Sequence, residues 1–209
     1  MVTMAEFWND SFTDESWKVL LQLRRDADFI LIGGWACFLL TGAIKSKDID
    51  IIVDHDALLA IRAKYAVKNT PFLKKYEAAA GNISIDIYVP HYSKLALPVA
   101  DIIAHTRIVE GFKVPEPEIL VLLKQGAELD RLASIKGQKD RADILNLLVN
   151  ADIDFAVYAG FAERFGLAHY PKRLREIVAG ARKEFEYLGK NPREAKLLRN
   201  GILNKLKSV

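Results

Sequence analysis

Two aspartates separated by one residue, Asp48 and Asp50, are the side chains in this 209-residue chain whose type and spacing most clearly indicate chemistry. They open the run Asp-Ile-Asp-Ile-Ile-Val at residues 48–53, which is otherwise apolar and β-prone. In a strand, side chains at positions i and i+2 point to the same face and lie about 7 Å apart along the chain. We therefore expect both carboxylates on one face, while Ile49 and Ile51 enter the core.

Two neighbouring carboxylates repel each other when both are ionised, unless a cation neutralises them or water solvates them. Mg²⁺ suits such a pair because it takes hard oxygen ligands and keeps positions for water and for substrate phosphates. The spacing thus predicts that Asp48 and Asp50 bind Mg²⁺, with Mn²⁺ as the alternative ion. The competing interpretation is a pair of solvated surface acids.

A glycine pair upstream of the acids suits the binding of a phosphate. Residues 29–32 are a short apolar run that predicts a buried strand, which ends at Gly33 and Gly34, and residues 35–40 can begin a helix. Because glycine has no side chain, backbone N–H groups can approach a phosphate there, and the N-terminus of a helix favours an anion. Three residues just before the acids add cations and a hydroxyl near a bound triphosphate: Lys45, Ser46 and Lys47.

Asp86 supplies a third carboxylate within the most regular strand pattern of the chain, residues 83–89, where isoleucines alternate with polar residues. If this strand lies beside residues 48–53, Asp86 can complete a two-metal site or act as general base toward an acceptor hydroxyl. The alternative is an edge strand that turns its polar face to water.

The elements that must position these residues change character after Pro115. Before it we expect helices at 14–27 and 56–66, and a hairpin whose strands, 102–109 and 112–114, flank Glu110-Gly111. After it, helical patterns follow at 117–133, 138–149, 152–165, 171–187 and 193–206, with Asp152, Pro171 and Pro192 where helices are expected to begin. The sequence therefore predicts an α+β fold with an α/β domain over residues 1–115 and a helical domain over 116–209.

The order of these motifs resembles the DNA polymerase beta-like nucleotidyltransferase superfamily, and within it the AbiEii-type toxin nucleotidyltransferases and their small prokaryotic relatives. Two further segments carry the resemblance. The run Ile-Leu-Val-Leu-Leu-Lys at 119–124, followed by Ala127 and Arg131, is similar to the helix that bears a functional lysine in that group. The run Lys-Asp-Arg-Ala-Asp-Ile at 139–144 is similar to its Lys/Arg-Asp-x-x-Asp element. The resemblance covers roughly residues 29–148.

The resemblance implies a mixed β-sheet with flanking helices, followed by a C-terminal helical bundle. It also implies that Asp48 and Asp50 hold Mg²⁺ against a nucleoside triphosphate while an acceptor hydroxyl attacks the α-phosphate and pyrophosphate leaves. Lys124 would neutralise the triphosphate as a point charge, unless it merely extends to solvent from an apolar helix face. Asp140 and Asp143, three residues apart, share one helix face, which meets either the nucleotide or solvent.

The charge distribution bears on the acceptor, because residues 171–209 contain 11 Lys/Arg and only 4 Asp/Glu. Such a basic tail can attract RNA, or can simply solvate the outer faces of terminal helices. We expect transfer to RNA (tRNA ends in particular) or to protein, and a toxin with a cognate antitoxin as partner. The alternatives are a small-molecule, antibiotic-type nucleotidyltransferase and a catalytically silent module that binds a nucleotide or an antitoxin.

A single cysteine, Cys37, rules out an internal disulfide framework and favours a reducing compartment. The first 17 residues have no basic and apolar segments typical of a secretory signal. The longest uncharged stretch, residues 29–44, is shorter than the roughly 20 residues that cross a bilayer. We therefore expect a soluble cytoplasmic protein without membrane contacts.

Overall fold

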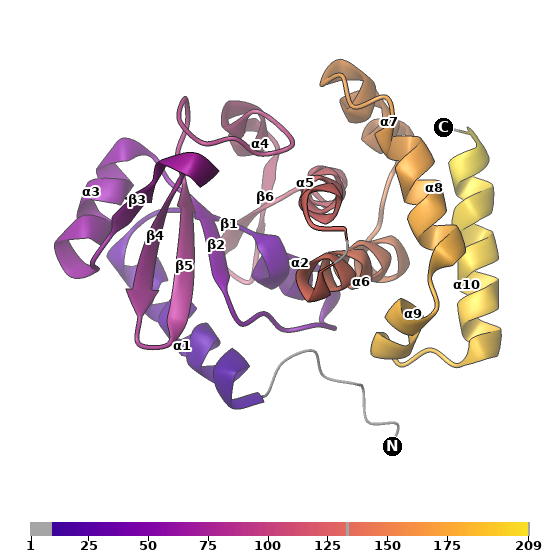
Figure 1. Cartoon of the computed structure of the whole chain (residues 1–209), viewed down its shortest axis with the longest axis horizontal. Helices are drawn as coiled ribbons and strands as arrows, with labels where there is room; N and C mark the ends of the chain where they lie inside the picture. The colour runs from indigo at the N-terminus through magenta and orange to yellow at the C-terminus, as the bar shows by residue number, and fades with distance from the viewer. Residues whose placement is uncertain (1–9, 133, 209) are drawn as a thin grey trace. The chain divides into compact units, whose positions relative to one another are not determined.

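The computed structural model describes residues 10–132 and 134–208, which form two compact units (Figure 1). Among the described residues, the first unit comprises 10–39 and 45–116 and contains the sheet. The second comprises 40–44 and 117–208 and is helical. The α+β fold class with a mixed sheet, as predicted from the sequence, is confirmed.

The described part of the first unit contains a seven-stranded sheet in the order β3-β4-β5-β2-β1-β7-β6. Strand β2 runs parallel to β5, and β1 runs parallel to β7, whereas the other neighbours are antiparallel. The strands are β1 (Ile30–Ile32), β2 (Ile49–Ile52), β3 (Lys68–Thr70), β4 (Lys75–Ala80), β5 (Ile83–Tyr88), β6 (Thr106–Val109) and β7 (Phe112–Pro115).

Helices α1 (Asp10–Asp26), α2 (Gly33–Thr41), α3 (His55–Lys64) and α4 (Val99–Ala104) accompany this sheet, and a 3₁₀ turn, η1 (Pro71–Leu73), joins β3 to β4. The last two residues of α2 count with the helical unit. Trp35 of α2 is 1% exposed, and its indole N–H donates to Ser16 Oγ of α1 at 2.9 Å. The buried ring therefore keeps a partner for its one polar atom.

The hairpin predicted around Glu110-Gly111 is present, as β6 and β7. Both turn residues have positive φ (49° and 78°), the backbone that a two-residue type I′ turn requires. Its first strand begins at Thr106, because the preceding residues 102–104 belong to α4. The sequence did not predict the second hairpin, β3 and β4.

The helical unit contains α5 (Pro117–Asp130), α6 (Ile135–Asn150), α7 (Phe155–Arg164), α8 (Tyr170–Gly180), α9 (Lys183–Tyr187), α10 (Pro192–Lys205) and η2 (Leu206–Ser208). The helix predicted over 171–187 is interrupted, because Ala181 is extended and ends α8. Helix α7 begins after Asp154, which caps it, and not at Asp152. Asn191 and Glu194 form a capping box at the start of α10, where Pro192 had predicted a helix start.

None of the described helices combines the length and the apolar character that a membrane crossing requires.

Candidate active site

Asp50 and Asp86 are register partners on the neighbouring parallel strands β2 and β5. Partners in a sheet point to the same face, and adjacent strands lie about 4.8 Å apart, so the two carboxylates are neighbours on one face. On the other face Ile49 and Ile51, with Ile85 and Ile87 of β5, are completely buried. The strand containing Asp86 thus lies beside the strand containing Asp50, which is the placement that the catalytic interpretation of Asp86 needs.

A third carboxylate, Glu77 of β4, extends this row because it is the register partner of Asp86. We call Asp50, Asp86 and Glu77 the carboxylate row. Lys75, two residues before Glu77 and on the same face of β4, contacts two members of the row. Its Nζ lies 2.6 Å from Asp86 Oδ2 and 3.0 Å from Glu77 Oε1. The Lys75 side chain is 13% exposed, so it is a partly buried cation between two acids.

The pKa of Lys75 reflects this position. Burial alone would lower the pKa of its ammonium group, but the hydrogen bonds and charges of Asp86, and then of Glu77, outweigh burial and raise the pKa above its ordinary value. Lys75 is therefore cationic at neutral pH and holds the Asp86 carboxylate in place.

Sequence reasoning missed Lys75 and Glu77 because it assigned no strand to residues 75–80. The dipeptide Gly81-Asn82, which joins β4 to β5, is a sequence pattern that predicts this strand. A Gly-Asn pair before an alternating strand predicts a hairpin, and hence a partner strand on its N-terminal side. Gly81 does have the positive φ (60°) of such a turn.

Gly33 lies directly against the carboxylate of Asp50. Ile32, the last residue of β1, is the register partner of Asp50, and Gly33 then begins α2 with φ +68°. A Cβ built on Gly33 would lie 2.1 Å from Asp50 Oδ2 and 2.7 Å from Asp50 Cγ. The position therefore requires glycine for its backbone conformation and for its space. Gly34, the next residue, is buried in the first turn of α2.

The segment that precedes β2 is fixed by polar contacts. Lys45 Nζ lies 3.0 Å from Asp14 Oδ1 of α1, and Lys47 Nζ lies 5.5 Å from the ring centroid of Phe12. The Ser46 hydroxyl is buried and donates to the backbone oxygen of Asp48 at 3.0 Å. Ser46 thus orients the backbone at Asp48, the half-buried residue before β2.

Mg²⁺ binding requires oxygen ligands in a suitable place. In residues 10–132 and 134–208, no three His, Cys, Asp or Glu side chains form a group that could hold a metal ion. Protein Mg²⁺ sites, however, commonly use one or two carboxylates and take their other ligands from water and substrate phosphates. Asp48 and Asp50 supply that donor chemistry, and the missing side chain of Gly33 leaves backbone next to Asp50. The two residues therefore fit Mg²⁺, whereas Asp86 has an ammonium group as its partner.

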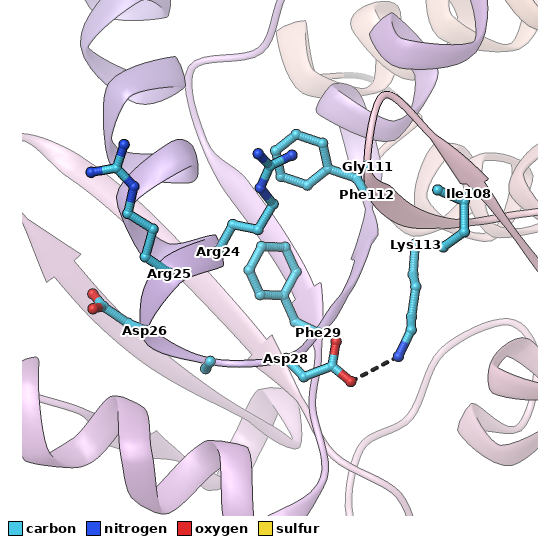
Figure 2. Close-up of a pocket in the computed structure, with 10 residues that line it drawn as sticks. Arg24, Arg25, Asp26, Asp28, Phe29, Ile108, Gly111, Phe112 and Lys113 are labelled. Atoms are coloured by element: carbon cyan, nitrogen blue, oxygen red, sulfur yellow. Dashed lines mark hydrogen bonds and ion pairs between the residues drawn. The ribbon is translucent and has the colours of Figure 1, made fainter.

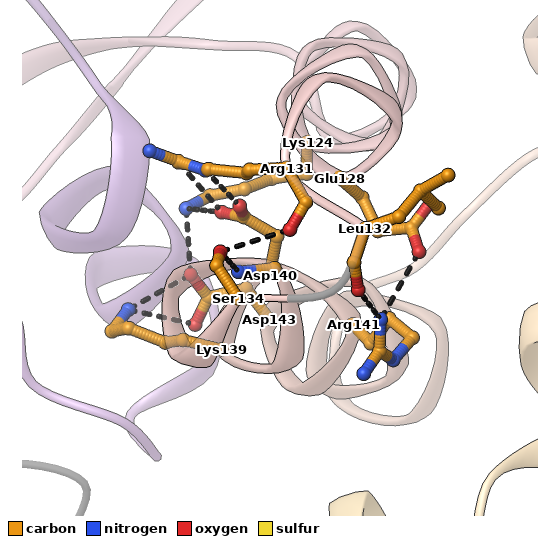
Figure 3. Close-up of polar contacts among 10 residues, drawn as sticks. Lys124, Glu128, Arg131, Leu132, Ser134, Lys139, Asp140, Arg141 and Asp143 are labelled. Carbon is orange, nitrogen blue, oxygen red and sulfur yellow. Dashed lines mark hydrogen bonds and ion pairs between the residues drawn. The ribbon is translucent and has the colours of Figure 1, made fainter.

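The remaining predicted site residues come together in the helical unit, where α5 and α6 contribute to a cluster of ion pairs (Figure 3). Lys124 Nζ lies 2.6 Å from Asp143 Oδ2 and 3.3 Å from Asp140 Oδ1. Lys139 Nζ lies 2.9 Å from Asp143 Oδ2, and Arg131 Nε lies 2.7 Å from Asp140 Oδ2. We call these five residues the α5–α6 ion-pair cluster.

Both aspartates of this cluster are buried, since Asp143 is fully buried and Asp140 is 2% exposed, so neither lies on a solvated face, whereas the Arg131 side chain is 40% exposed. Burial acts to raise the pKa of Asp143, but the charges and hydrogen bonds of Lys124 and Lys139 outweigh it and lower the pKa below its ordinary value of 3.8. The structure thus gives Lys124, Asp140 and Asp143 partners in one another. Contacts of these residues with a nucleotide stay a prediction.

A pocket of about 420 Å³ lies elsewhere in the sheet unit, at the start of β1 (Figure 2). Phe29, which precedes β1, lines it, whereas Gly33 follows the other end of that strand. Among the lining residues, Lys113 Nζ lies 2.7 Å from Asp28 Oδ2, and the Arg24 guanidinium lies 4.6 Å from the Phe112 ring centroid. The carboxylate row is not part of this pocket.

No protein-family model matches the chain, and no curated protein matches it. Among solved structures, the crystal structure of JHP933 from Helicobacter pylori is similar over 96% of this chain and 95% of that protein, with a TM-score of 0.51 and 14% identity. An antigenic nucleotidyltransferase-like protein from Paracoccidioides brasiliensis is similar over 69% of this chain and 78% of its own, with a TM-score of 0.38 and 16% identity. The first similarity shows a shared fold alone, and the second is too weak to support an argument.

Proposed function

We propose that this chain is a Mg²⁺-dependent nucleotidyltransferase that moves a nucleoside monophosphate from a nucleoside triphosphate to an acceptor hydroxyl. The observation that carries the proposal is the juxtaposition of Asp50 and Asp86 on neighbouring strands, with the glycine backbone at the start of α2 against Asp50. Two carboxylates lie on one face of the sheet, next to a helix that begins with two glycines. This arrangement suits a metal–triphosphate complex.

The roles divide among these residues. Asp48 and Asp50 would hold Mg²⁺, which when bound neutralises charge on the triphosphate. Backbone N–H groups at Gly33 and Gly34 would bind a phosphate. Asp86, held by Lys75, accepts the proton of the acceptor hydroxyl. A bond then forms between the acceptor oxygen and the α-phosphorus, the bond from that phosphorus to the α,β-bridging oxygen breaks, and pyrophosphate leaves.

For the acceptor we favour RNA, tRNA ends in particular, ahead of protein, and a cellular role as a toxin restrained by a cognate antitoxin. The excess of Lys/Arg in residues 171–209 supports a polyanionic acceptor. A small hydroxylated acceptor is the alternative within the same chemistry. Salt distinguishes the two, because binding of RNA through Lys and Arg weakens steeply as salt rises.

Labelling tests this proposal and identifies donor and acceptor class together. The purified protein is incubated with Mg²⁺, each α-³²P-labelled nucleoside triphosphate in turn, and total RNA or cell extract. Asp50→Asn is compared with Asp56→Asn, a matched change at an exposed aspartate in the first turn of α3. We expect label in RNA or protein with the wild type and with Asp56→Asn, and at least about 100-fold less with Asp50→Asn, the loss typical of removing a group that stabilises the transition state. Full activity of Asp50→Asn would refute the metal-site assignment.

A further inference from the structure

The hairpin β3–β4 and the adjoining helix α3 form a basic surface with one exposed aromatic ring. Residues 57–76 contain five Lys/Arg and no Asp or Glu. Phe72, at the tip of the hairpin in η1, is 95% exposed, and Leu73 beside it is 50% exposed. A phenyl ring almost fully in water contributes nothing to the core, so the whole ring is accessible to a partner.

Two cations lie close to aromatic rings. The Arg62 guanidinium of α3 is 5.0 Å from the centroid of the Tyr76 ring of β4, and Lys74 Nζ is 5.5 Å from that of Tyr92. Tyr76 and Tyr92 are themselves 5.3 Å apart. Lys68 of β3 is the register partner of Glu77 and lies on the other face of the hairpin. We call Arg62, Phe72, Lys74 and the Tyr76–Tyr92 pair the β3–β4 surface.

This surface is organised before any partner binds. The Tyr92 hydroxyl donates to Asn69 Oδ1 of β3 at 2.6 Å, so the loop after β5 is attached to the hairpin. Lys74 adopts a left-handed backbone (φ 50°) that ends η1, and its N–H donates to Pro71 O at 3.2 Å. A tight turn therefore presents the Phe72 ring, and partner binding does not need to order the segment first.

We propose that the β3–β4 surface binds single-stranded RNA, with a base stacked on Phe72 and backbone phosphates bound by Arg62 and Lys74. Every base has a flat face that can stack on an aromatic ring, and a groove or ridge of cations tracks the phosphates. The absence of acids from residues 57–76 makes the surface complementary to a polyanion.

The carboxylate row lies on the other face of the hairpin from the tyrosine pair of this surface. Lys74 and Lys75 are consecutive, and while Lys74 lies near Tyr92 of the surface, Lys75 contacts Asp86 and Glu77 of the carboxylate row. Tyr76 is the register partner of the buried Ile87, whereas Glu77 is that of Asp86, so the tyrosine pair and the carboxylate row lie on opposite faces of the hairpin. RNA binding at the surface is therefore independent of the proposed function.

Fluorescence anisotropy with a labelled single-stranded RNA of about 12 nucleotides, without nucleoside triphosphate, tests the surface on the whole chain. We expect Phe72→Ala and Phe72→Leu each to weaken binding about tenfold, because both remove the stacking ring, and Phe72→Tyr to bind like the wild type. Lys74→Gln should reduce the slope of log Kd against log salt by about 0.7, the effect of one phosphate contact. Lys18→Gln, a matched change at an exposed lysine of α1 outside both basic regions, should leave the slope unchanged.

Three results would overturn the inference: no RNA binding by the wild-type chain, equal binding by Phe72→Ala, or a salt slope that falls with Lys18→Gln and not with Lys74→Gln. RNA binding would also be rejected if the wild-type chain bound anionic lipid vesicles in place of RNA and Phe72→Leu bound these vesicles as tightly as the wild type. The surface would then be a membrane-binding surface. The test is independent of catalysis, because Asp50→Asn should bind the RNA normally. If RNA binds as expected but no nucleotide is transferred, the surface stands and the proposed function fails.

Discussion

Gly33 shows most directly how a single residue shapes the candidate site. Its backbone has φ +68°, and its missing side chain leaves the space that the Asp50 carboxylate fills. The sequence predicted Gly33 and Asp50 as members of one site, and the register of β1 with β2 brings them into contact. Their contact depends on an antiparallel pairing of two strands, which the order of motifs along the chain does not specify.

Gly33→Ala should remove transferase activity and destabilise the fold. The left-handed backbone alone costs an alanine about 1–2 kcal/mol, and the added Cβ must also displace the Asp50 carboxylate. Gly42→Ala is the matched control, because Gly42 has φ +70° but nothing within 4 Å of its built Cβ. Urea unfolding and labelling of both variants check this: Gly42→Ala should lose about 1–2 kcal/mol and keep activity. Equal activity of the two variants would contradict the role of Gly33.

At the scale of elements, the strands with strong alternation were predicted from the sequence and the polar ones were not. Residues 83–89 alternate isoleucine with polar residues, and they form β5 almost as expected. In β4, by contrast, a single residue, Ala78, is buried, and its three consecutive alanines have weak β-propensity. Pairing with β5 makes β4 a strand, so Lys75 and Glu77 were invisible as neighbours of Asp86 until that pairing was known.

In the helical unit, a motif that indicated nucleotide binding forms the α5–α6 ion-pair cluster, whose two aspartates are buried. Periodicity placed Lys124, Asp140 and Asp143 on helices, and it placed both aspartates on one face. It could not show that α5 packs on α6, which sets these charges against each other and away from water.

Asp143→Asn should therefore destabilise the protein by about 3–5 kcal/mol, since it leaves Lys124 and Lys139 buried without their shared counter-ion. The pKa of Asp143 is lowered in the folded state, so its stabilising contribution is present above the unfolded value of 3.8 and is lost as pH falls through the folded pKa. Urea unfolding at neutral pH and below pH 3.8 should show the wild-type advantage shrinking in acid. Asp152→Asn, at an exposed position, is the control. An unchanged free energy of unfolding for Asp143→Asn would contradict the stabilising role of this carboxylate.

At the scale of the whole molecule, the fold is shared with a protein whose sequence is only weakly similar. JHP933 shares the fold over nearly the full length of both chains at 14% identity. A fold hosts many chemistries, so the functional argument must come from the site. Here it comes from the carboxylate row, from Gly33 and from two basic regions, the terminal residues 171–209 and the β3–β4 surface. Composition revealed the first basic region, whereas the second required the hairpin and its contact with α3.

The fate of each phosphorus atom tests the central claim most directly. Nucleoside triphosphate labelled with ³²P at the α or at the γ position is incubated with the wild-type protein, Mg²⁺ and the acceptor fraction found by labelling. Nucleotidyl transfer predicts α-label in the acceptor and γ-label in pyrophosphate, both lost with Asp50→Asn and both kept with Asp56→Asn. If γ-label entered the acceptor, or if pyrophosphate formed equally well with Asp50→Asn, the assignment of this site to nucleotidyl transfer would be wrong.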